Sequence, residues 1–499
     1  MADWCFYGRQ EPLGDLRQII NGGRWFFCRV QGRRRIGKTT LLAKLTEANA
    51  DMAERLVYMQ VPDSDERDVV ATFRRSLIES DFDLAHDLAS AITDFISMAD
   101  AIAQLCRAGA LVVLDEFQYF TRPRLGAFNS FLQAQVDQLR NANLKHGGLF
   151  VLGSLQSEMD ALLSDKAAPL YGRITQQIQL GHWDFEDLQS LFIAQGVHEP
   201  TQWLTLWTFF EGVPKFYHDA YEQGLFDVAA PELAATLLER MFLRSSSPLA
   251  EEADTWFLRE LRGKSMSILN FLAEHPGCQN ADILTALTTD GDTTLTQQIG
   301  SLVNNYHMVE RLQPVFAEAK SRNARYYIAD NFLLAWLAVA KPARAAARMK
   351  PLEKVLPAAL NRLAALEGLA FEKWIRQLHV ETSRKGRGDF AISDLKLGFW
   401  NRPRDAANSI EIDLVALDQE NLRIRFGSCK RAEHAHDGLA LTKFEQHIAA
   451  FLATRQYREI AAWQIEKALF APVFTPHTRA VLEGKGYVCK DLADYARLF

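Results

Sequence analysis

The sequence predicts a multidomain α/β protein whose N-terminal domain contains a parallel sheet. A chain of 499 residues is too long for one hydrophobic core, and domains of ~100–200 residues imply about three of them. Three short apolar runs, at 25–30, 111–114 and 149–152, are typical of strands that are buried on both faces, as parallel strands are. Apolar residues at helical spacing place helices at 40–45 and 66–107, between these strands.

The composition is that of an ordinary globular protein. Hydrophobic residues make up 48% of the chain and charged residues 24%, which excludes a disordered protein. The six cysteines are scattered without a C-x-x-C pair, and residues 1–12 show no secretory signal, so a reducing cytosol is expected. The longest apolar run, near 332–340, is far below membrane-spanning length. We therefore expect a cytoplasmic protein with no membrane partner.

A phosphate-binding loop is the strongest motif of the sequence. Residues 32–39, GRRRIGKT, fit the pattern G-x-x-x-x-G-K-[ST] between a predicted strand and a predicted helix. The glycines let backbone N–H groups close on phosphate oxygens at the positive end of the helix dipole. Lys38 is expected to reach the β and γ phosphates and Thr39 to ligate Mg²⁺; a chance match in a turn rich in Gly and Arg is the alternative. The residues predicted to bind nucleotide here are Gly32, Arg35, Gly37, Lys38, Thr39 and Thr40.

Asp115 and Glu116 follow the apolar run at 111–114 and provide a second nucleotide signal. A buried parallel strand would present Asp115 at its carboxyl end to hold the Mg²⁺ shell, with Glu116 beyond it to polarise the attacking water. The alternative is a strand that ends in a solvated pair of acids. The two signals in this order predict binding of ATP with Mg²⁺ and slow or regulated hydrolysis, with Lys38, Asp115 and Glu116 as catalytic residues.

The stretch FYGRQEPL at 6–13 precedes the loop as the box F-x-G-R-x-x-E-L precedes G-R-R-x-G-K-T in the archaeal-type ATPases. These ATPases belong to the STAND branch related to AAA+ proteins, and the sequence resembles them over most of its length. The resemblance implies that Gly8 and Arg9 lie against the adenine and ribose. It also implies that Ser154, after the strand at 149–152, senses the γ-phosphate, although a lone serine at a strand end is more often a turn former.

Two further stretches resemble the same family. PLYGR at 169–173 implies that Arg173 meets the phosphates in cis or in trans; a surface arginine after a glycine turn is the alternative. GVP at 212–214 resembles the G-x-P element of STAND ATPases and implies that Pro214 packs near the base of the nucleotide. Glycine and proline together also simply punctuate helices, so this assignment stays open.

Three helices followed by a hairpin at 264–330 predict a winged helix. Its third helix, 294–305, would be the one that enters the DNA groove, yet it contains no Arg or Lys. Basic residues occur instead in the wing, as Lys320, Arg322 and Arg325. Because duplex binding ordinarily depends on phosphate neutralisation, a structural or protein-contact role is at least as well supported.

The resemblance also implies a C-terminal domain similar to PD-(D/E)XK nucleases. Such enzymes use a helix acid, a strand Asp and then D/E-x-K, so that carboxylates hold Mg²⁺ and the Lys positions water. Glu367 or Glu372 supplies the helix acid here, and Asp413 the strand acid. Ser428 and Lys430 stand where D/E-x-K belongs, with serine in place of the acid.

A serine hydroxyl is a weak ligand for a hard cation, so the nuclease-like site is expected to bind Mg²⁺ poorly unless Glu445 replaces the missing acid. We therefore favour a nuclease-derived binding domain over an active nuclease. The predicted domains are an ATPase core at 1–180, a helical lid at 181–262, a winged helix at 263–340, a basic linker at 341–362 and the nuclease-like domain at 363–499.

Two classes of function fit these domains. One is a STAND-type switch ATPase that couples its nucleotide state to engagement of double-stranded DNA. The other is a nucleotide-gated assembly or signalling protein that binds itself, as a homo-oligomer, or another protein, with an inactive nuclease-like domain. The winged helix without basic residues on its third helix favours the second class, and the nuclease-like tail favours the first.

Overall fold

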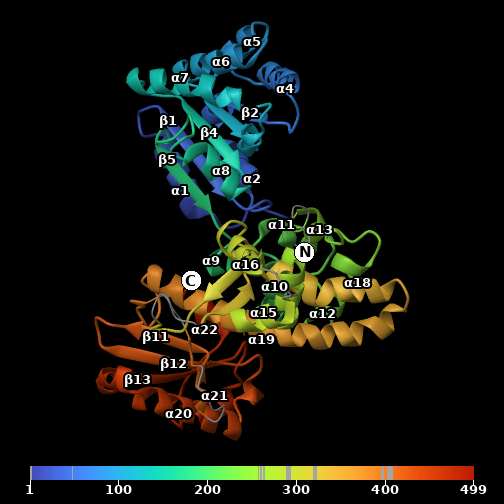
Figure 1. Ribbon diagram of the computed structural model, residues 1–499, viewed down its shortest axis with the longest axis vertical. Coiled ribbons are helices and arrows are strands. Elements are labelled where there is room, and N and C mark those ends of the chain that lie inside the picture. Colours follow the sequence, from blue (N-terminus) through green and yellow to red (C-terminus); the bar gives the residue numbers. More distant parts are fainter. Residues whose placement is uncertain are drawn as a thin grey trace. The chain divides into compact units, whose positions relative to one another are not determined.

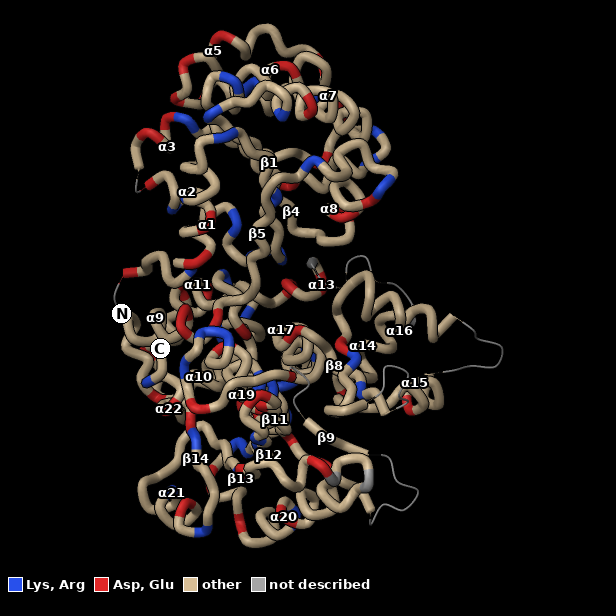
Figure 2. Tube along the Cα trace, turned by 90° about the vertical axis from the view of Figure 1, so that its left-hand side faces the viewer, with Lys and Arg blue, Asp and Glu red and all other residues tan. Residues whose placement is uncertain are grey.

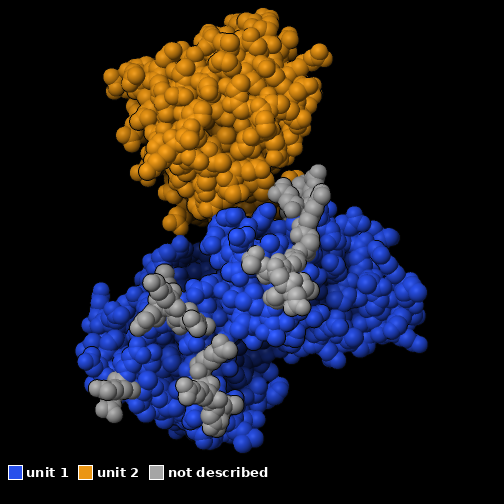
Figure 3. Space-filling view, in the orientation of Figure 1, with its two compact units in different colours: residues 1–5, 184–212, 216–499 blue, residues 6–183, 213–215 orange. Residues whose placement is uncertain are grey.

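The chain forms two compact units in the computed structural model (Figures 1 and 3). The N-terminal unit comprises residues 6–183 and 213–215, and the C-terminal unit comprises residues 1–5, 184–212 and 216–499. The division into a lid, a winged helix, a linker and a nuclease-like domain within the second unit stays a prediction. The structure describes residues 3–47, 49–256, 258, 261, 264–287, 294–317, 323–394, 398–401 and 408–499.

A parallel sheet of five strands forms the centre of the N-terminal unit, which confirms the predicted α/β core. The strand order is β2-β3-β4-β1-β5, so β1 and β3 lie on either side of β4. Ligands of such sheets bind beyond the carboxyl ends of the strands, where the strand order reverses. The strands are β1 (Phe26–Gly32), β2 (Leu56–Gln60), β3 (Leu111–Asp115), β4 (Gly148–Gly153) and β5 (Gln176–Leu180).

Helices cover both faces of this sheet (Figure 1). Successive strand residues alternate between two apolar clusters, so that Phe26 packs on one face and Phe27 on the other. One face is covered by α1 (Gln10–Ile20), α2 (Lys38–Glu47) and α3 (Ala50–Glu54). The other face is covered by α4 (Glu66–Ile78), α5 (Asp83–Ala89), α6 (Phe95–Arg107), η1 (Phe117–Thr121), α7 (Ala127–Asn141) and α8 (Gln156–Leu163).

The C-terminal unit begins with helices and continues with a small antiparallel sheet of order β6-β8-β7. Three helices and a hairpin follow one another in the order that the sequence predicts for 264–330. The wing residues Lys320 and Arg322 lie outside the described residues. The elements are α9 (Phe185–Ala194), α10 (Pro200–Phe210), α11 (Pro214–Glu222), α12 (Ala230–Leu238), η2 (Glu239–Leu243), α13 (Glu252–Trp256), α14 (Lys264–Glu274), β6 (Cys278–Gln279), α15 (Asn280–Leu287), α16 (Thr294–Asn304), β7 (Val309–Leu312) and β8 (Arg325–Ile328).

The stretch expected to be a basic linker is largely helical. It contains α18 (Lys341–Ala347) and the first residues of α19 (Leu352–Arg384), a helix of 33 residues with Pro357 in its second turn. Alanine and leucine, both strong helix formers, explain why helix continues through this region. Before it, α17 (Asn331–Ala335) and η3 (Trp336–Ala340) complete the helical part of the unit.

A second α/β layer follows α19. Its sheet has the order β11-β12-β13-β14, antiparallel between β11 and β12 and parallel elsewhere. Apolar residues of α20 and α21 cover one face of this sheet. The elements are β9 (Phe399–Trp400), which pairs with β10 (Glu411–Ile412), then β11 (Leu414–Asp418), β12 (Arg423–Cys429), η5 (Glu433–Ala435), α20 (Gly438–Ala453), η6 (Arg455–Ala462), β13 (Gln464–Phe470), α21 (Pro476–Glu483), β14 (Val488–Lys490) and α22 (Leu492–Ala496).

Candidate functional site

The phosphate-binding loop connects the end of β1 to the start of α2. A Cβ atom on Gly32 would lie 2.6 Å from the carbonyl oxygen of Leu180, and Gly37 has a φ of +88°, so both positions require glycine. The first turn of α2 presents its N–H groups to the loop, as an anion site needs. The sequence motif thus has the strand, turn and helix that it requires.

Lys38 lies folded over the loop. Its Nζ donates hydrogen bonds to the carbonyl oxygens of Gly32, at 2.8 Å, and Arg33, at 3.2 Å. Burial lowers the pKa of Lys38, while the negative charges of Glu116 and Asp115 act in the opposite direction. The ammonium group is therefore held at the loop, where a bound phosphate would compete for it.

Thr39 and Asp115 meet across the carboxyl edge of the sheet. The Thr39 Oγ1 donates to Asp115 Oδ2 at 2.8 Å, and the Tyr58 hydroxyl donates to the same oxygen at 2.8 Å. Asp115 is only 5% exposed. A hydroxyl and a carboxylate side by side are oxygen ligands of the kind that Mg²⁺ takes next to nucleotide phosphates. These residues fit the magnesium site that the sequence predicts.

Glu116 and Ser154 lie together although 38 residues separate them. The Ser154 Oγ donates to Glu116 Oε2 at 3.1 Å, and Glu116 has a left-handed backbone with φ 56°. Gln118 joins them: its Nε2 contacts the same Glu116 oxygen and Ser154 Oγ, and its Oε1 accepts from the Ser154 N–H at 3.4 Å. No role for Gln118 was predicted from the sequence. A buried amide two residues beyond the acid pair was the signal that was missed.

The N-terminal box lies beside the loop. Arg9 has a φ of 60°, is 8% exposed and donates from one guanidinium nitrogen to the carbonyl oxygens of Ile36, at 3.2 Å, and Gly181, at 2.8 Å. Gly8 precedes it with a φ of +63°. Arg9 thus contacts Ile36 of the loop itself, and contact of Gly8 and Arg9 with the adenine and ribose stays a prediction.

The predicted roles of Arg173, Thr40 and Pro214 in nucleotide binding stay predictions. Arg173 pairs with Asp137 of α7, with its Nε and one terminal nitrogen each 2.8 Å from a different carboxylate oxygen. An arginine finger at this position would have to leave Asp137. Thr40 is exposed on α2. Pro214 begins α11 within the short segment 213–215 that belongs to the N-terminal unit.

A second cluster of charged residues lies in the C-terminal unit. Asp413, between β10 and β11, accepts hydrogen bonds from the Cys429 N–H at 2.9 Å and from Lys430 Nζ at 3.3 Å. Burial and the neighbouring Asp413 raise the pKa of Glu372 on α19 to about 8. Glu372, Asp413 and Lys430 are therefore electrostatic neighbours, as a nuclease-like site would need.

The two candidate helix acids differ in their surroundings. Glu367 accepts from Thr205 Oγ1 at 2.7 Å and from Arg431 Nε at 2.6 Å, so it connects α10 with the segment after β12. Glu445, the possible substitute, accepts from Lys467 at 2.6 Å and from the Tyr487 hydroxyl at 2.8 Å. Of these acids, Glu372 is the one that Asp413 influences.

The fit of the nuclease-like cluster to Mg²⁺ is poor. Ser428, which stands in place of an acid, is buried in β12. Burial and the neighbouring Asp413 raise the pKa of Glu372, which disfavours the charged form that binds a metal ion well. Lys430 already forms an ion pair with Asp413 at 3.3 Å.

Comparisons with known proteins agree with the geometry of the N-terminal unit. Residues 27–189 match a family described as "AAA domain", and residues 336–450 match a family described as "Archaea bacterial proteins of unknown function". Residues 27–189 therefore form a P-loop ATPase domain. The ATPase domain contains the loop, the Thr39–Asp115 pair and the Glu116–Ser154 contact.

An uncharacterized protein of Methanocaldococcus jannaschii is 25% identical over 431 residues, which cover 85% of this chain and 87% of the relative. Among solved structures, a Walker-type ATPase of Pyrococcus abyssi is 17% identical, with 67% of this chain and 96% of that chain covered and a TM-score of 0.47. The ORC2 protein of Aeropyrum pernix is 14% identical, with 72% and 94% covered and a TM-score of 0.45. Within the described residues, no helix has both the length and the apolar character needed to cross a membrane.

Proposed function

We propose that this protein is a STAND-type switch ATPase of the archaeal type, which binds ATP with Mg²⁺ and hydrolyses it slowly. The contact that carries the proposal is the 2.8 Å hydrogen bond between Thr39 and Asp115, because it joins the two nucleotide motifs at one sheet edge. The neighbouring contact between Ser154 and Glu116 supports it. These contacts support a site in which Thr39 and Asp115 ligate Mg²⁺ and Glu116 orients water beside the phosphate loop.

Each residue of the proposed site has its own role in binding or hydrolysis of ATP. The loop N–H groups and Lys38 would bind the β and γ phosphates. Thr39 and Asp115 would hold Mg²⁺, which when bound would supply positive charge beside these phosphates. Glu116 orients the attacking water. Gln118 and Ser154 fix the direction of the Glu116 carboxylate, since both contact its Oε2.

The test compares Lys38→Ala and Glu116→Gln with the wild type. Lys38→Ala should weaken ATP binding on the order of 10–100-fold, as expected for loss of a charged hydrogen bond. Glu116→Gln should retain ATP binding, and its rate of hydrolysis should fall on the order of 10²–10⁴-fold. Lys44→Ala is the matched control, because Lys44 is an exposed lysine of the same helix. Equal hydrolysis by Glu116→Gln and the wild type would refute the role of Glu116.

We infer further that the nucleotide state controls engagement of double-stranded DNA through the helix-and-hairpin segment at 264–330 and the nuclease-like layer. The charge pattern limits how this segment meets DNA: the described helices α15 and α16 contain no Lys or Arg (Figure 2). Contact would have to involve the hairpin and the nuclease-like layer. A mobility shift with random duplex tests this, because phosphate-mediated binding weakens as salt rises.

The alternative is a nucleotide-gated assembly or signalling protein that binds itself or another protein. The same absence of Lys and Arg from α15 and α16 favours it. ATP-dependent change of the oligomeric state without any salt-sensitive DNA shift would select this alternative.

We propose that the nuclease-like layer binds without cleaving, because Ser428 replaces an acid and Lys430 already pairs with Asp413. Plasmid incubated in Mg²⁺ or Mn²⁺ with the wild type and with an Asp413→Ala/Lys430→Ala double variant should stay intact in both cases. Nicking by the wild type alone would overturn this proposal.

A further inference from the structure

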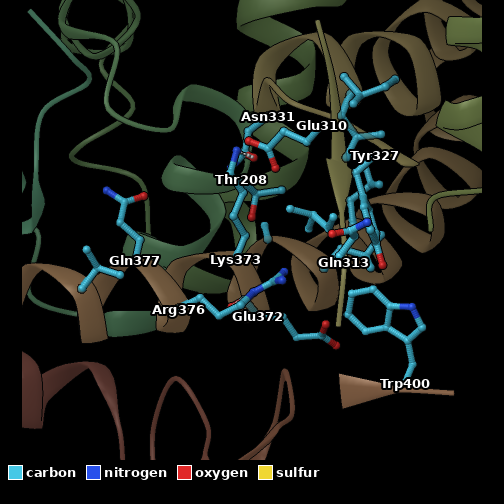
Figure 4. A pocket seen from close by; sticks show the side chains of 17 residues that line it. Thr208, Glu310, Gln313, Tyr327, Asn331, Glu372, Lys373, Arg376, Gln377 and Trp400 are labelled. Atoms are coloured by element: carbon cyan, nitrogen blue, oxygen red, sulfur yellow. Dashed lines mark hydrogen bonds between the residues drawn. The ribbon is translucent and has the colours of Figure 1, made fainter. Parts of the chain in front are cut away.

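The C-terminal unit contains a cavity of about 310 Å³ that the proposed function leaves unused (Figure 4). It lies between α10, α17, α19, the β7–β8 hairpin and Trp400 of β9. Cavities that bind ligands measure ~300–1,000 Å³, so this one is of the size for a single small group.

Aromatic side chains form one wall of the cavity. Trp400 is 6% exposed, and its Nε1–H donates to the carbonyl oxygen of Asn323 at 2.7 Å. The Arg325 guanidinium lies 4.8 Å from the ring centre and pairs with Glu411 at 2.6 Å, which fixes the ring further. Figure 4 shows Tyr327 on the same side of the cavity. The wall is thus a rigid aromatic surface.

Three charged side chains that line the cavity have hydrogen-bonding atoms left for a ligand. Within the described part of the chain, the carboxyl groups of Glu310 and Glu372 have no hydrogen-bond or ion-pair partner, and Arg376 uses only its Nε, which donates to the Glu372 carbonyl oxygen at 3.2 Å. Figure 4 shows Glu372 and Arg376 projecting from α19 on the side of Tyr327 and Trp400. Burial raises the pKa of both carboxyl groups.

Lys373 provides a contrast on the same helix. Its Nζ contacts Glu211 at 3.0 Å, the Ala329 carbonyl oxygen at 2.6 Å and Asn331 at 3.1 Å, so its charge is fully used within the protein. Two carboxyl groups, which can accept or donate hydrogen bonds, and the two terminal nitrogens of one guanidinium are therefore available to a ligand in the cavity.

We propose that this cavity takes one unstacked nucleotide, with its base against Trp400 and Tyr327, its polar edge at Glu310 and Glu372, and its phosphate at Arg376. Proteins that bind an unstacked base stack it on aromatic or arginine planes and bind its edge by hydrogen bonds. A cationic peptide side chain fits less well, because the Arg376 charge would repel it.

The position of Glu372 connects this cavity with the nuclease-like cluster, since Glu372 lines the cavity and is the neighbour of Asp413. For a nucleotide that belongs to a DNA strand, the inference rests on the proposed DNA engagement; for a free nucleotide it does not.

The experiment uses the full chain with its ATPase site saturated by ADP and Mg²⁺ in one series and by a non-hydrolysable ATP analogue and Mg²⁺ in a second series. Binding of a 12-nucleotide single strand containing 2-aminopurine, of the matching duplex and of deoxynucleoside monophosphates is measured for the wild type, Arg376→Met and Glu310→Gln. Arg362→Met and Glu353→Gln are the matched controls, because both residues are exposed on the first half of α19. Unchanged ATP hydrolysis and thermal unfolding show that each variant is folded.

We expect the single strand to bind more tightly than the duplex, with a rise in 2-aminopurine fluorescence that reports unstacking. Arg376→Met and Glu310→Gln should each weaken binding by about 5- to 100-fold, the range that one base contact contributes, while the controls stay within about twofold of the wild type, as surface changes do.

The outcomes separate this inference from the proposed function. DNA binding that neither cavity variant weakens would overturn the cavity assignment and leave DNA engagement intact. Binding of free monophosphates that Arg376→Met weakens, without binding of any strand, would support the cavity and contradict DNA engagement. Absence of binding by either ligand would overturn both.

Discussion

Tyr58 lies in the ATPase site, although its sequence position did not predict this. Its hydroxyl donates to the same Asp115 oxygen as Thr39, at 2.8 Å in both cases. Burial and the charge of Asp115 raise the pKa of Tyr58, so it stays a protonated donor throughout the neutral range. A hydrogen bond of this kind fixes the direction in which the carboxylate faces the metal.

Tyr58→Phe should therefore raise the Mg²⁺ concentration needed for half-maximal ATP hydrolysis by about 10- to 100-fold. This is the usual effect of removing a hydrogen-bond partner of a metal ligand. The measurement is a Mg²⁺ titration at saturating ATP. Tyr171→Phe serves as the control, because Tyr171 is 43% exposed. The same Mg²⁺ midpoint in both variants would show that Asp115 does not need Tyr58.

Strand β12 contains a buried arginine whose partners come from other elements. The Arg425 side chain is 1% exposed and pairs with Glu466 of β13 and with Asp389, the latter at 3.0 Å. It also lies 3.2 Å from the ring nitrogen of His379 on α19. Arg425 thus joins α19 to the face of the sheet opposite α20.

Arg425→Met should lower the free energy of unfolding by about 3–5 kcal/mol, because it removes the buried guanidinium that pairs with both Glu466 and Asp389. Arg497→Met is the control: its side chain is 72% exposed, and a surface pair contributes about 1 kcal/mol or less. Urea unfolding measures both. Equal losses in the two variants would mean that burial of Arg425 adds nothing.

Glu381 is a buried acid at the junction of α9 and α19. Glu381 accepts from the Phe185 N–H at 3.0 Å and from Gln377 at 2.6 Å, and burial raises the pKa of Glu381 to about 7. The folded chain retains a proton that the unfolded chain releases above its usual pKa of 4.5. Stability of the C-terminal unit therefore falls as pH rises from 4.5 to 7.

Glu381→Gln should remove this fall, which amounts to at most about 3 kcal/mol. Free energies of unfolding at pH 5 and pH 7.5 test it, with Glu353→Gln, an exposed acid of the same helix, as the control. A pH profile of the Gln variant identical to that of the wild type would assign the dependence to other groups.

At the scale of the whole molecule, the two units have separate apolar cores. Each is of domain size and is expected to unfold as its own cooperative transition. ATP with Mg²⁺ should raise the transition of the unit that contains the loop by about 2.7 kcal/mol at a ligand concentration of 100 Kd.

Scanning calorimetry measures this shift, which Lys38→Ala should reduce to about 0.4–1.4 kcal/mol at the same ligand concentration. A shift of both transitions in the wild type would show that nucleotide binding is coupled to the C-terminal unit. An undiminished shift in Lys38→Ala would show that the nucleotide binds elsewhere.

The sequence by itself determined the features that depend on neighbouring residues. The loop at 32–39 and the acid pair at the end of β3 are local patterns, and the parallel strands are short apolar runs that can be recognised one at a time. Residues 341–362 are largely helical, as their alanine and leucine favour, and the role of this stretch as a linker stays a prediction.

Only the tertiary structure decided which distant side chains meet. Glu367 and Glu372 were equivalent candidates in the sequence, yet five residues on a helix of ~3.6 residues per turn point them to different sides, one to Arg431 and one towards Asp413. Gln118 joins Glu116 to Ser154, and Arg173 pairs with Asp137, through contacts between separate elements. Such contacts depend on how elements pack, which the local spacing of residues does not specify.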